Sequence, residues 1–94
     1  MALHTVFMRE HNRIATKLST INPLWNDQLL YDESRKIVGA ILQHIIYNEY
    51  LPDILGNAAM TSNGLNPQTS GYFTGYDSSK NAAIYNSFSA AAFR

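Results

Sequence analysis

The chain has 94 residues, enough for one small domain or for part of a larger one. Its residues are 46% hydrophobic and 15% charged, a composition that describes a folding chain and argues against a disordered tail. Seven basic residues balance seven acidic ones and form no run, which disfavours nucleic-acid binding. There is no cysteine, so disulfide frameworks, thiolate metal sites and cysteine nucleophiles are excluded. No apolar run is long enough to span a bilayer, and the first residues lack a signal-peptide pattern.

The first predicted element is a helix over about residues 2–21. Its apolar residues recur at spacings of three, four and seven, which places them on one helix face: Leu3, Val6, Phe7, Ile14, Leu18 and Ile21. Glu10 and Arg13, three residues apart, predict a weak surface ion pair. Asn22-Pro23 ends the helix, because the residue before a proline is pushed out of the α region.

A second, longer helix is predicted over about residues 27–51, with Asn26 or Asp27 as its N-terminal cap. Asp32 precedes Lys36 by four residues, the favourable order for a helical ion pair of roughly 0.3–0.5 kcal/mol. The second half of this helix is apolar around more than one face, which indicates burial inside a larger assembly.

Pro52 is predicted to end or kink this second helix, and Gly56 to close a short extra turn. The composition then changes to Asn, Ser, Thr, Gly and Pro, which predicts a long loop over about residues 57–77. Three aromatic side chains near its end are interpreted as anchors that hold the loop, in preference to a ligand platform: Tyr72, Phe73 and Tyr76.

The last predicted element is a helix over about residues 78–94. Ile84, Phe88, Ala91 and Ala92 fall on one stripe of it. The predicted fold class is therefore all-α, with two long helices and a C-terminal helix joined by a long loop. A chain this short has a limited core to set against ordering entropy of roughly 1–2 kcal/mol per residue, so marginal stability is expected.

The three histidines do not predict a metal site. His4 and His11 share a helix face but lie about 10 Å apart along the axis, too far to bind one ion together. His44 belongs to another helix and is interpreted as an interface or core-edge residue. Zinc and related metals need ligands that converge at about 2.0–2.3 Å.

Carboxylates and hydroxyls do not predict a catalytic site either. Asp32 and Glu33 are adjacent and diverge on a helix, and Glu49 and Asp53 flank a proline, so both pairs are interpreted as surface charge. Nucleophile-elbow and phosphate-loop motifs are absent from the sequence. Residue chemistry alone predicts a helical module and does not indicate its function.

Three stretches of the chain resemble motifs of one protein family, the animal haem peroxidases, which include peroxidasin-like, thyroid and leukocyte peroxidases. Residues 4–15 (HTVFMREHNRIA) resemble "HTLxxREHNRxA", and residues 84–94 (IYNSFSAAAFR) resemble "NxFxxAAFRxGH". Residues 30–56 are similar to "LYxEARKIVGAxxQxITYxEYLPxxLG", and residues 22–25 (NPLW) to "LNPxW". The order and spacing agree, so the resemblance covers nearly the whole chain, as an internal part of the haem peroxidase domain spanning residues 1–94.

The resemblance implies a haem-dependent peroxidase, an oxidoreductase that reduces hydrogen peroxide and oxidises a small electron donor. Haem and usually calcium are the cofactors in the family, and secretion to the extracellular space is usual. The family's distal histidine and arginine lie upstream of the region resembled, and the proximal histidine follows the "FR" of "FRxGH". The chain is therefore expected to lack catalytic and metal-ligating residues, to be inactive alone, and to have the remainder of the peroxidase domain as its partner.

One site residue follows from the resemblance. Arg94 matches the arginine of "FRxGH", which implies that it binds the cofactor by pairing with a haem propionate, a role that suits the guanidinium fork. The alternative for Arg94 is an exposed arginine without a ligand. His4, His11 and His44 match non-ligand positions. The alternative function is a non-catalytic helical structural or interaction module from a truncated gene.

Overall fold

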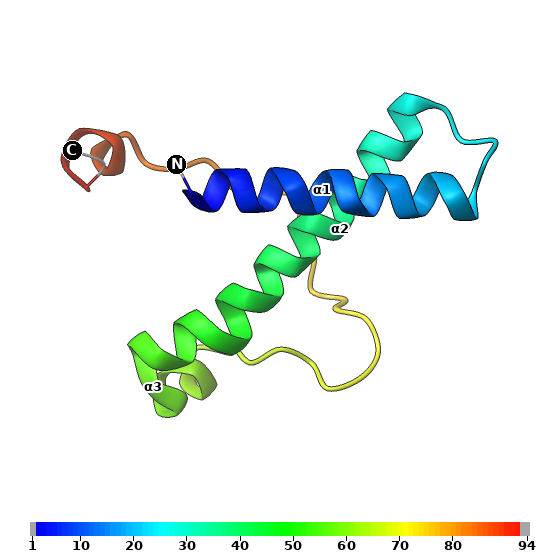
Figure 1. Cartoon of the computed structure of the whole chain (residues 1–94). Helices are drawn as coiled ribbons and strands as arrows, with labels where there is room; N and C mark the ends of the chain where they lie inside the picture. Colours follow the sequence, from blue (N-terminus) through cyan, green and yellow to red (C-terminus); the bar gives the residue numbers. More distant parts are fainter. Residues whose placement is uncertain (1, 93–94) are drawn as a thin grey trace.

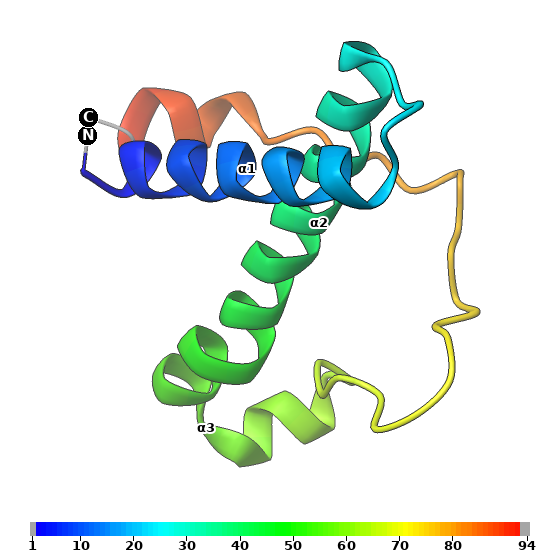
Figure 2. The ribbon, with the colours of Figure 1, turned by 45° about the vertical axis from the view of Figure 1, so that its right-hand side comes forward.

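The computed structural model describes residues 2–92, and these residues form helices, turns and loops without a β-strand. The helices are α1 (Ala2–Ile21), α2 (Asp27–Ile45) and α3 (Leu51–Ser62). Two π-helical turns accompany them, η1 (Ile46–Tyr50) and η2 (Phe88–Ala92). α1 lies across α2, and α3 turns back at the far end of α2 (Figures 1 and 2). The predicted all-α fold class is confirmed.

The connection between α1 and α2 is set by local hydrogen bonds. α1 ends at Ile21, and the backbone N–H of Asn22 donates to the Leu18 carbonyl at 2.8 Å, as expected for a helix stopped before a proline. Asn26 then adopts extended backbone angles, and its Oδ1 accepts from the Leu29 N–H at 2.9 Å. This bond satisfies one of the free donors at the start of α2, so of the two predicted caps, Asn26 and Asp27, Asn26 is the one observed.

The crossing of α1 and α2 forms the tightest part of the fold. Ile14 of α1 is 7% exposed and Ser34 of α2 is completely buried. α2 is the only helix that α1 contacts within residues 2–92, so α2 covers Ile14. A small side chain at position 34 lets the two helix backbones approach each other closely.

The helical path from α2 to α3 passes through the widened turn η1. The Leu51 N–H donates to the carbonyl of Ile46, five residues earlier, in place of the α-helical partner four residues earlier. Pro52 follows directly. Its ring would collide with the carbonyl of Asn48 in a regular α-helix, and it has no N–H to donate. A widened turn in front of Pro52 relieves that collision. The helical path therefore passes through Pro52, which was predicted to end or kink it, and the kink lies at Gly56.

α3 extends further than the sequence prediction, which placed a loop from residue 57. Gly56 has a φ of +77° and interrupts the helical path, in agreement with the short turn predicted before it. A second helical segment then continues to Ser62. Ala58 and Ala59 are strong helix formers, and Met60 is only 1% exposed. Burial of Met60 outweighs the polar composition that suggested a loop.

The predicted helix over residues 78–94 starts later than expected. Residues 78–80 form an isolated turn, residues 81–85 are irregular, and helical structure begins at residue 86. Asp77 Oδ1 accepts from the Ser79 N–H and Asn81 Oδ1 accepts from the Ala83 N–H, both at 2.9 Å. Such side-chain bonds stabilise Asx turns and compete with helix formation, which explains the late start. Residues 93–94 of the predicted helix lie outside the described part of the chain.

Candidate functional site

The three histidines lie on different parts of the molecule. His4 is exposed in the first turns of α1, His11 is half-buried in the middle of α1, and His44 is exposed near the end of α2. Within residues 2–92, no group of three or more His, Asp or Glu side chains gathers in a way that could hold a metal ion.

His11 joins α1 to α2. Its Nε2 lies 3.3 Å from the Tyr31 carbonyl oxygen, which only accepts hydrogen bonds, so Nε2 donates. The two rings are 5.1 Å apart between centroids and are tilted by 58°. Its Nδ1 lies 3.3 Å from Oδ1 of Asn12. His11 therefore has a structural role at the helix crossing, which the sequence pattern did not reveal because Tyr31 is twenty residues away.

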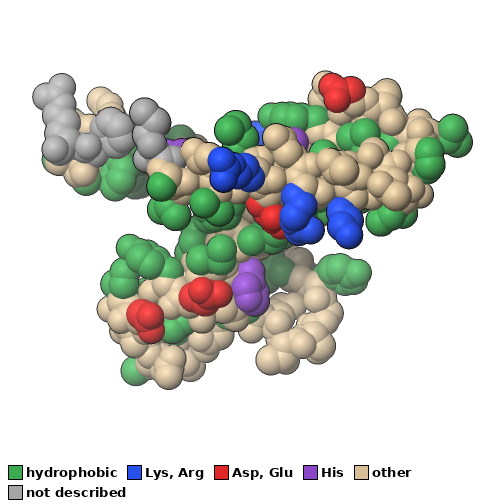
Figure 3. All heavy atoms as spheres, viewed as in Figure 1, with side chains coloured by type: hydrophobic (Ala, Val, Ile, Leu, Met, Phe, Trp, Pro, Cys, Tyr) green, Lys and Arg blue, Asp and Glu red, His purple; other side chains and the backbone are tan. Residues whose placement is uncertain are grey.

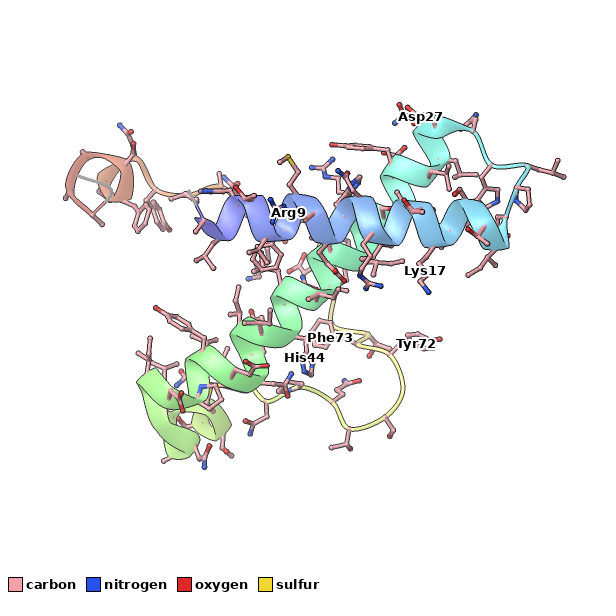
Figure 4. The ribbon with its side chains drawn as sticks, viewed as in Figure 1. Arg9, Lys17, Asp27, His44, Tyr72 and Phe73 are labelled. Carbon is pink, nitrogen blue, oxygen red and sulfur yellow. The ribbon has the colours of Figure 1, made fainter. Side chains whose placement is uncertain are left out.

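His44 faces an open groove of about 590 Å³ between α2–η1 and the following loop. Figure 4 shows His44 pointing from α2 toward the loop that carries Phe73. Asn48 Nδ2 lies 3.2 Å from the His44 carbonyl and 3.1 Å from its Nδ1. An amide nitrogen only donates, so Nδ1 is the acceptor in this contact. His44 is exposed within residues 2–92, so its predicted place at an interface or core edge stays a prediction.

The three loop aromatics do not anchor the loop to the described residues. Tyr72 is 93% exposed, Phe73 74% and Tyr76 85%. The prediction that they pin the loop is therefore wrong within residues 2–92, because no helix in this range covers their rings. Phe73 alone contributes to the wall of the groove beside His44.

The ion pair predicted between Asp32 and Lys36 is replaced by other contacts. Lys36 Nζ instead contacts Glu33 Oε1 at 2.5 Å, three residues apart. Asp32 Oδ2 accepts from Gln28 Nε2 at 2.9 Å. The pair Asp32 and Glu33 is therefore engaged with separate neighbours along the helix, which agrees with a role as surface charge.

The predicted pair of Glu10 and Arg13 is present on the surface of α1. The guanidinium donates twice to the carboxylate, from Nε to Oε2 at 2.8 Å and from Nη2 to Oε1 at 2.6 Å. These hydrogen bonds lower the pKa of Glu10 and raise the pKa of Arg13. Arg13 is exposed and Glu10 is half-buried at the surface of α1, so the pair contributes little to the stability of the fold.

The most extensive feature of the surface is apolar. Figure 3 shows hydrophobic side chains gathered in the angle between α1 and the far half of α2. Large apolar side chains remain exposed on all three α-helices and near η2, including Leu3, Val6, Met8, Ile21, Ile37, Leu42, Ile54, Leu55, Ile84 and Phe88. Soluble monomers rarely expose contiguous apolar surface on this scale, so these helix faces are suited to packing against another protein body.

The predicted cofactor-binding residue, Arg94, lies outside the described residues. The chain leads toward it through η2, which touches none of the other helices in the described part of the structure. No helix within residues 2–92 is both long and apolar enough to cross a membrane.

Comparison with known proteins identifies one family. The family described as animal haem peroxidase matches residues 1–94. The human peroxidasin homolog is 50% identical over 93 residues, covering 99% of this chain and 6% of its own length. Peroxidasin of Drosophila melanogaster is 46% identical over 94 residues, covering 100% of the chain and 6% of its own length. Human eosinophil peroxidase is 46% identical over 90 residues, covering 96% of the chain and 12% of its own length.

These relatives are therefore far longer than the present chain, which spans 6% to 12% of their length. No solved structure matches the chain. The match to the family nevertheless extends from the first residue to the last, and it includes the helix crossing, the widened turn before Pro52 and the stretch that leads to Arg94. The chain belongs to the animal haem peroxidase family.

Proposed function

We propose that residues 1–94 form a helical part of the domain of a haem-dependent peroxidase that reduces hydrogen peroxide and oxidises a small electron donor. The family match over residues 1–94, with relatives 46–50% identical, is the observation that carries the proposal. The chain's own share is structural: it supplies helices that support the haem pocket. The whole protein is proposed to act outside the cell.

The exposed apolar helix faces support this structural role. α1 and α2 are fixed to each other by Ile14, Ser34 and the contact of His11 with Tyr31. The angle between them is lined with hydrophobic side chains that residues 2–92 leave uncovered. Burial of such surface contributes roughly 25 cal/mol per Å², which favours docking against the remainder of the peroxidase domain.

We infer that haem binds elsewhere in the domain and that the described histidines of this chain do not hold its iron. Both ring nitrogens of His11 face protein oxygens, and the Nδ1 of His44 is engaged by Asn48. The groove beside His44 is walled by a loop with exposed aromatics and opens to solvent. We therefore place the iron ligand, the distal histidine and arginine, and the calcium site in the remainder of the domain.

Arg94 is the residue of this chain that we propose to bind the cofactor. When bound, haem supplies the redox chemistry of the family. Arg94 would hold it through two parallel hydrogen bonds from its guanidinium to a propionate carboxylate, a geometry that lysine cannot reproduce. Arg94→Lys in the full-length protein is expected to weaken haem retention, whereas Lys80→Arg, in the exposed loop, is expected to leave it unchanged.

The proposal is tested on the native transcript and on the protein it encodes. The messenger RNA is sequenced outward from both ends of this reading frame, and the full product is assayed for peroxide-dependent oxidation of a donor. A frame that continues into a Gly-His after Arg94, with haem-dependent activity, supports the proposal. The 94-residue chain is then titrated with haemin, and a tight, saturable Soret shift would contradict the assignment of the haem site to other residues.

A non-catalytic helical interaction module is the second candidate function. The large exposed apolar side chains on α1, α2 and α3 favour it as well, because a partner protein could cover them. A transcript that starts at Met1 and stops after Arg94 would select this alternative. The chain would then be expected to bind a protein partner and to show no peroxidase activity with haemin.

A further inference from the structure

α3 ends in a hydrogen-bonded cap built around the Asn-Gly pair of the sequence, Asn63-Gly64. Gly64 has a φ of +63°, a conformation that glycine adopts without steric cost. The Gly64 N–H donates to the Thr61 carbonyl at 3.2 Å, and the Leu65 N–H donates to the Met60 carbonyl at 2.9 Å. This pair of bonds defines a Schellman motif, with Asn63 as the C-cap that follows the last helical residue, Ser62.

The Asn63 N–H donates to the Ala59 carbonyl at 3.1 Å, and the side chain of Asn63 adds a further contact to the same carbonyl. Its Nδ2 donates to the Ala59 carbonyl at 2.9 Å and lies 3.3 Å from Ser62 Oγ. Asn63 and Gly64 are both exposed to solvent. The end of α3 is therefore held by an amide side chain that water can reach and that is followed by a residue without a side chain.

We propose that Asn63 is a site of spontaneous deamidation that changes the end of α3. The backbone nitrogen of Gly64 attacks Cγ of Asn63, a new C–N bond closes a five-membered succinimide, and the Cγ–Nδ2 bond breaks with release of ammonia. Water then opens the ring at either carbonyl and leaves aspartate or isoaspartate. Glycine leaves the attacking nitrogen unhindered, and the reaction requires the cap to open because the Gly64 N–H is engaged in it.

The product is incompatible with the cap in three ways. The donor facing the Ala59 carbonyl becomes a carboxylate oxygen, which is an acceptor and repels it. A negative charge then stands at the C-terminal end of a helix, where the helix dipole disfavours it. Isoaspartate also adds a carbon to the main chain between Cα of residue 63 and the nitrogen of Gly64, which lengthens the chain enclosed by both hydrogen bonds of the Schellman motif.

The charge effect alone gives a measurable expectation. An unfavourable charge at a helix end costs roughly 0.3–1 kcal/mol, which raises the opening equilibrium of the last turn about two- to five-fold. Deamidation of Asn63 would thus act as a slow, one-way loosening of the end of α3 and of the loop that follows it. The inference goes beyond the proposed function and involves no haem.

The first test uses the full 94-residue chain, incubated at mildly alkaline pH and analysed by peptide mass spectrometry with detection of isoaspartate. Asn63 is expected to lose its amide first. Asn22 and Asn66 serve as internal controls, because each precedes a proline whose nitrogen carries no hydrogen and cannot close the ring. Asn63→Gln keeps the amide but must close a larger ring, so it is expected to remain intact. Loss of the amide at Asn63 no faster than at Asn66 would overturn the proposal.

The second test measures the structural consequence with Asn63→Asp, the simplest product. The Cα chemical shifts of residues 57–62 are expected to lose helical character, while those of α1 stay unchanged. The unchanged α1 signals exclude general unfolding as the cause. Helical chemical shifts that persist through Ser62 in this variant would show that the cap tolerates the carboxylate. The proposed effect of deamidation on the end of α3 would then be wrong.

Discussion

Ser34 of α2 is the residue on which the packing of α1 against α2 can be tested. Its side chain is completely buried, and its hydroxyl has no hydrogen-bond partner. A buried hydroxyl without a partner costs about 1–3 kcal/mol of desolvation. Ser34→Ala removes that group without leaving a large void, so the helix crossing is expected to gain about 1 kcal/mol. Native-state hydrogen exchange of the amides around the crossing measures the gain.

Ser34→Leu provides the matched control, because it is expected to destabilise the helix crossing. A larger side chain at the crossing forces α1 and α2 apart, and overpacking of this kind costs about 1–3 kcal/mol. Faster exchange in Ser34→Ala than in the unmodified chain would show that the hydroxyl finds a partner that the structure does not contain.

The ion pair of Glu10 and Arg13 predicts how the stability of α1 depends on pH. The hydrogen bonds from Arg13 lower the pKa of Glu10, so the ionised pair stabilises α1 above the ordinary carboxyl pKa. That contribution is lost as the pH falls through the lowered pKa of the folded chain. In Arg13→Gln, the Glu10 midpoint is expected to rise toward its usual range, as followed by NMR of the Glu10 carboxyl carbon.

Salt provides the control for this titration. The pair is exposed, so added salt screens it and should raise the Glu10 midpoint in the unmodified chain but hardly in Arg13→Gln. Identical midpoints in the two proteins at low salt would contradict the interaction.

The bounds of the helices were predictable where the sequence carries a clear helix stop or helix cap. The Asn22-Pro23 stop and the Asn26 cap set the end of α1 and the start of α2 as expected. The second half of α3 was missed because its polar residues resemble a loop, and burial of Met60 depends on tertiary contacts that periodicity does not report. The late start near residue 86 reflects Asx bonds from Asp77 and Asn81.

The candidate site was less predictable than the elements. Arg94 rests on the family resemblance alone, because periodicity and spacing do not reveal a propionate partner. The contact of His11 with Tyr31 links residues on two helices, so only the helix crossing brings them together. Ser34 carries no signal in the sequence either, since a serine within a helix is usually at the surface.

Pro52 and η1 give a prediction at the scale of one element. The widened turn ends with the Leu51 N–H bonded to the Ile46 carbonyl, directly before the proline. Pro52→Ala restores an N–H and removes the ring, so the turn is expected to revert to regular α-helical bonding. One residue of register corresponds to about 100° of helix rotation, so α3 would turn about its axis relative to α2.

NMR contacts measure this change, because nuclear Overhauser effects between residues four apart should replace those between residues five apart across residues 46–51. Pro67→Ala, in the loop, is the control and should leave the turn as it is. Persistence of the five-residue pattern in Pro52→Ala would mean that the widened turn does not depend on the proline.

The whole molecule is extended for its length. Its radius of gyration is 16.9 Å, whereas a compact chain of this size has one of about 12 Å. Its accessible surface is 8491 Å², against ~5,500 Å² expected for a compact protein of this mass. Within residues 2–92, only Ile14 and Met60 are buried apolar side chains. Most of the surface that would stabilise the helices is therefore left uncovered.

The isolated 94-residue chain is consequently expected to be marginally stable. Ordering its backbone costs roughly 1–2 kcal/mol per residue, and the few buried side chains offset little of that cost. Heating should give a broad loss of far-ultraviolet circular dichroism, with a weak near-ultraviolet signal from the exposed aromatics. If the segment lies within a full peroxidase domain, as proposed, it should melt cooperatively there, because the rest of the domain would cover the apolar angle between α1 and α2. A sharp melt with full near-ultraviolet dichroism for the isolated chain would refute this prediction and would favour a self-sufficient helical module.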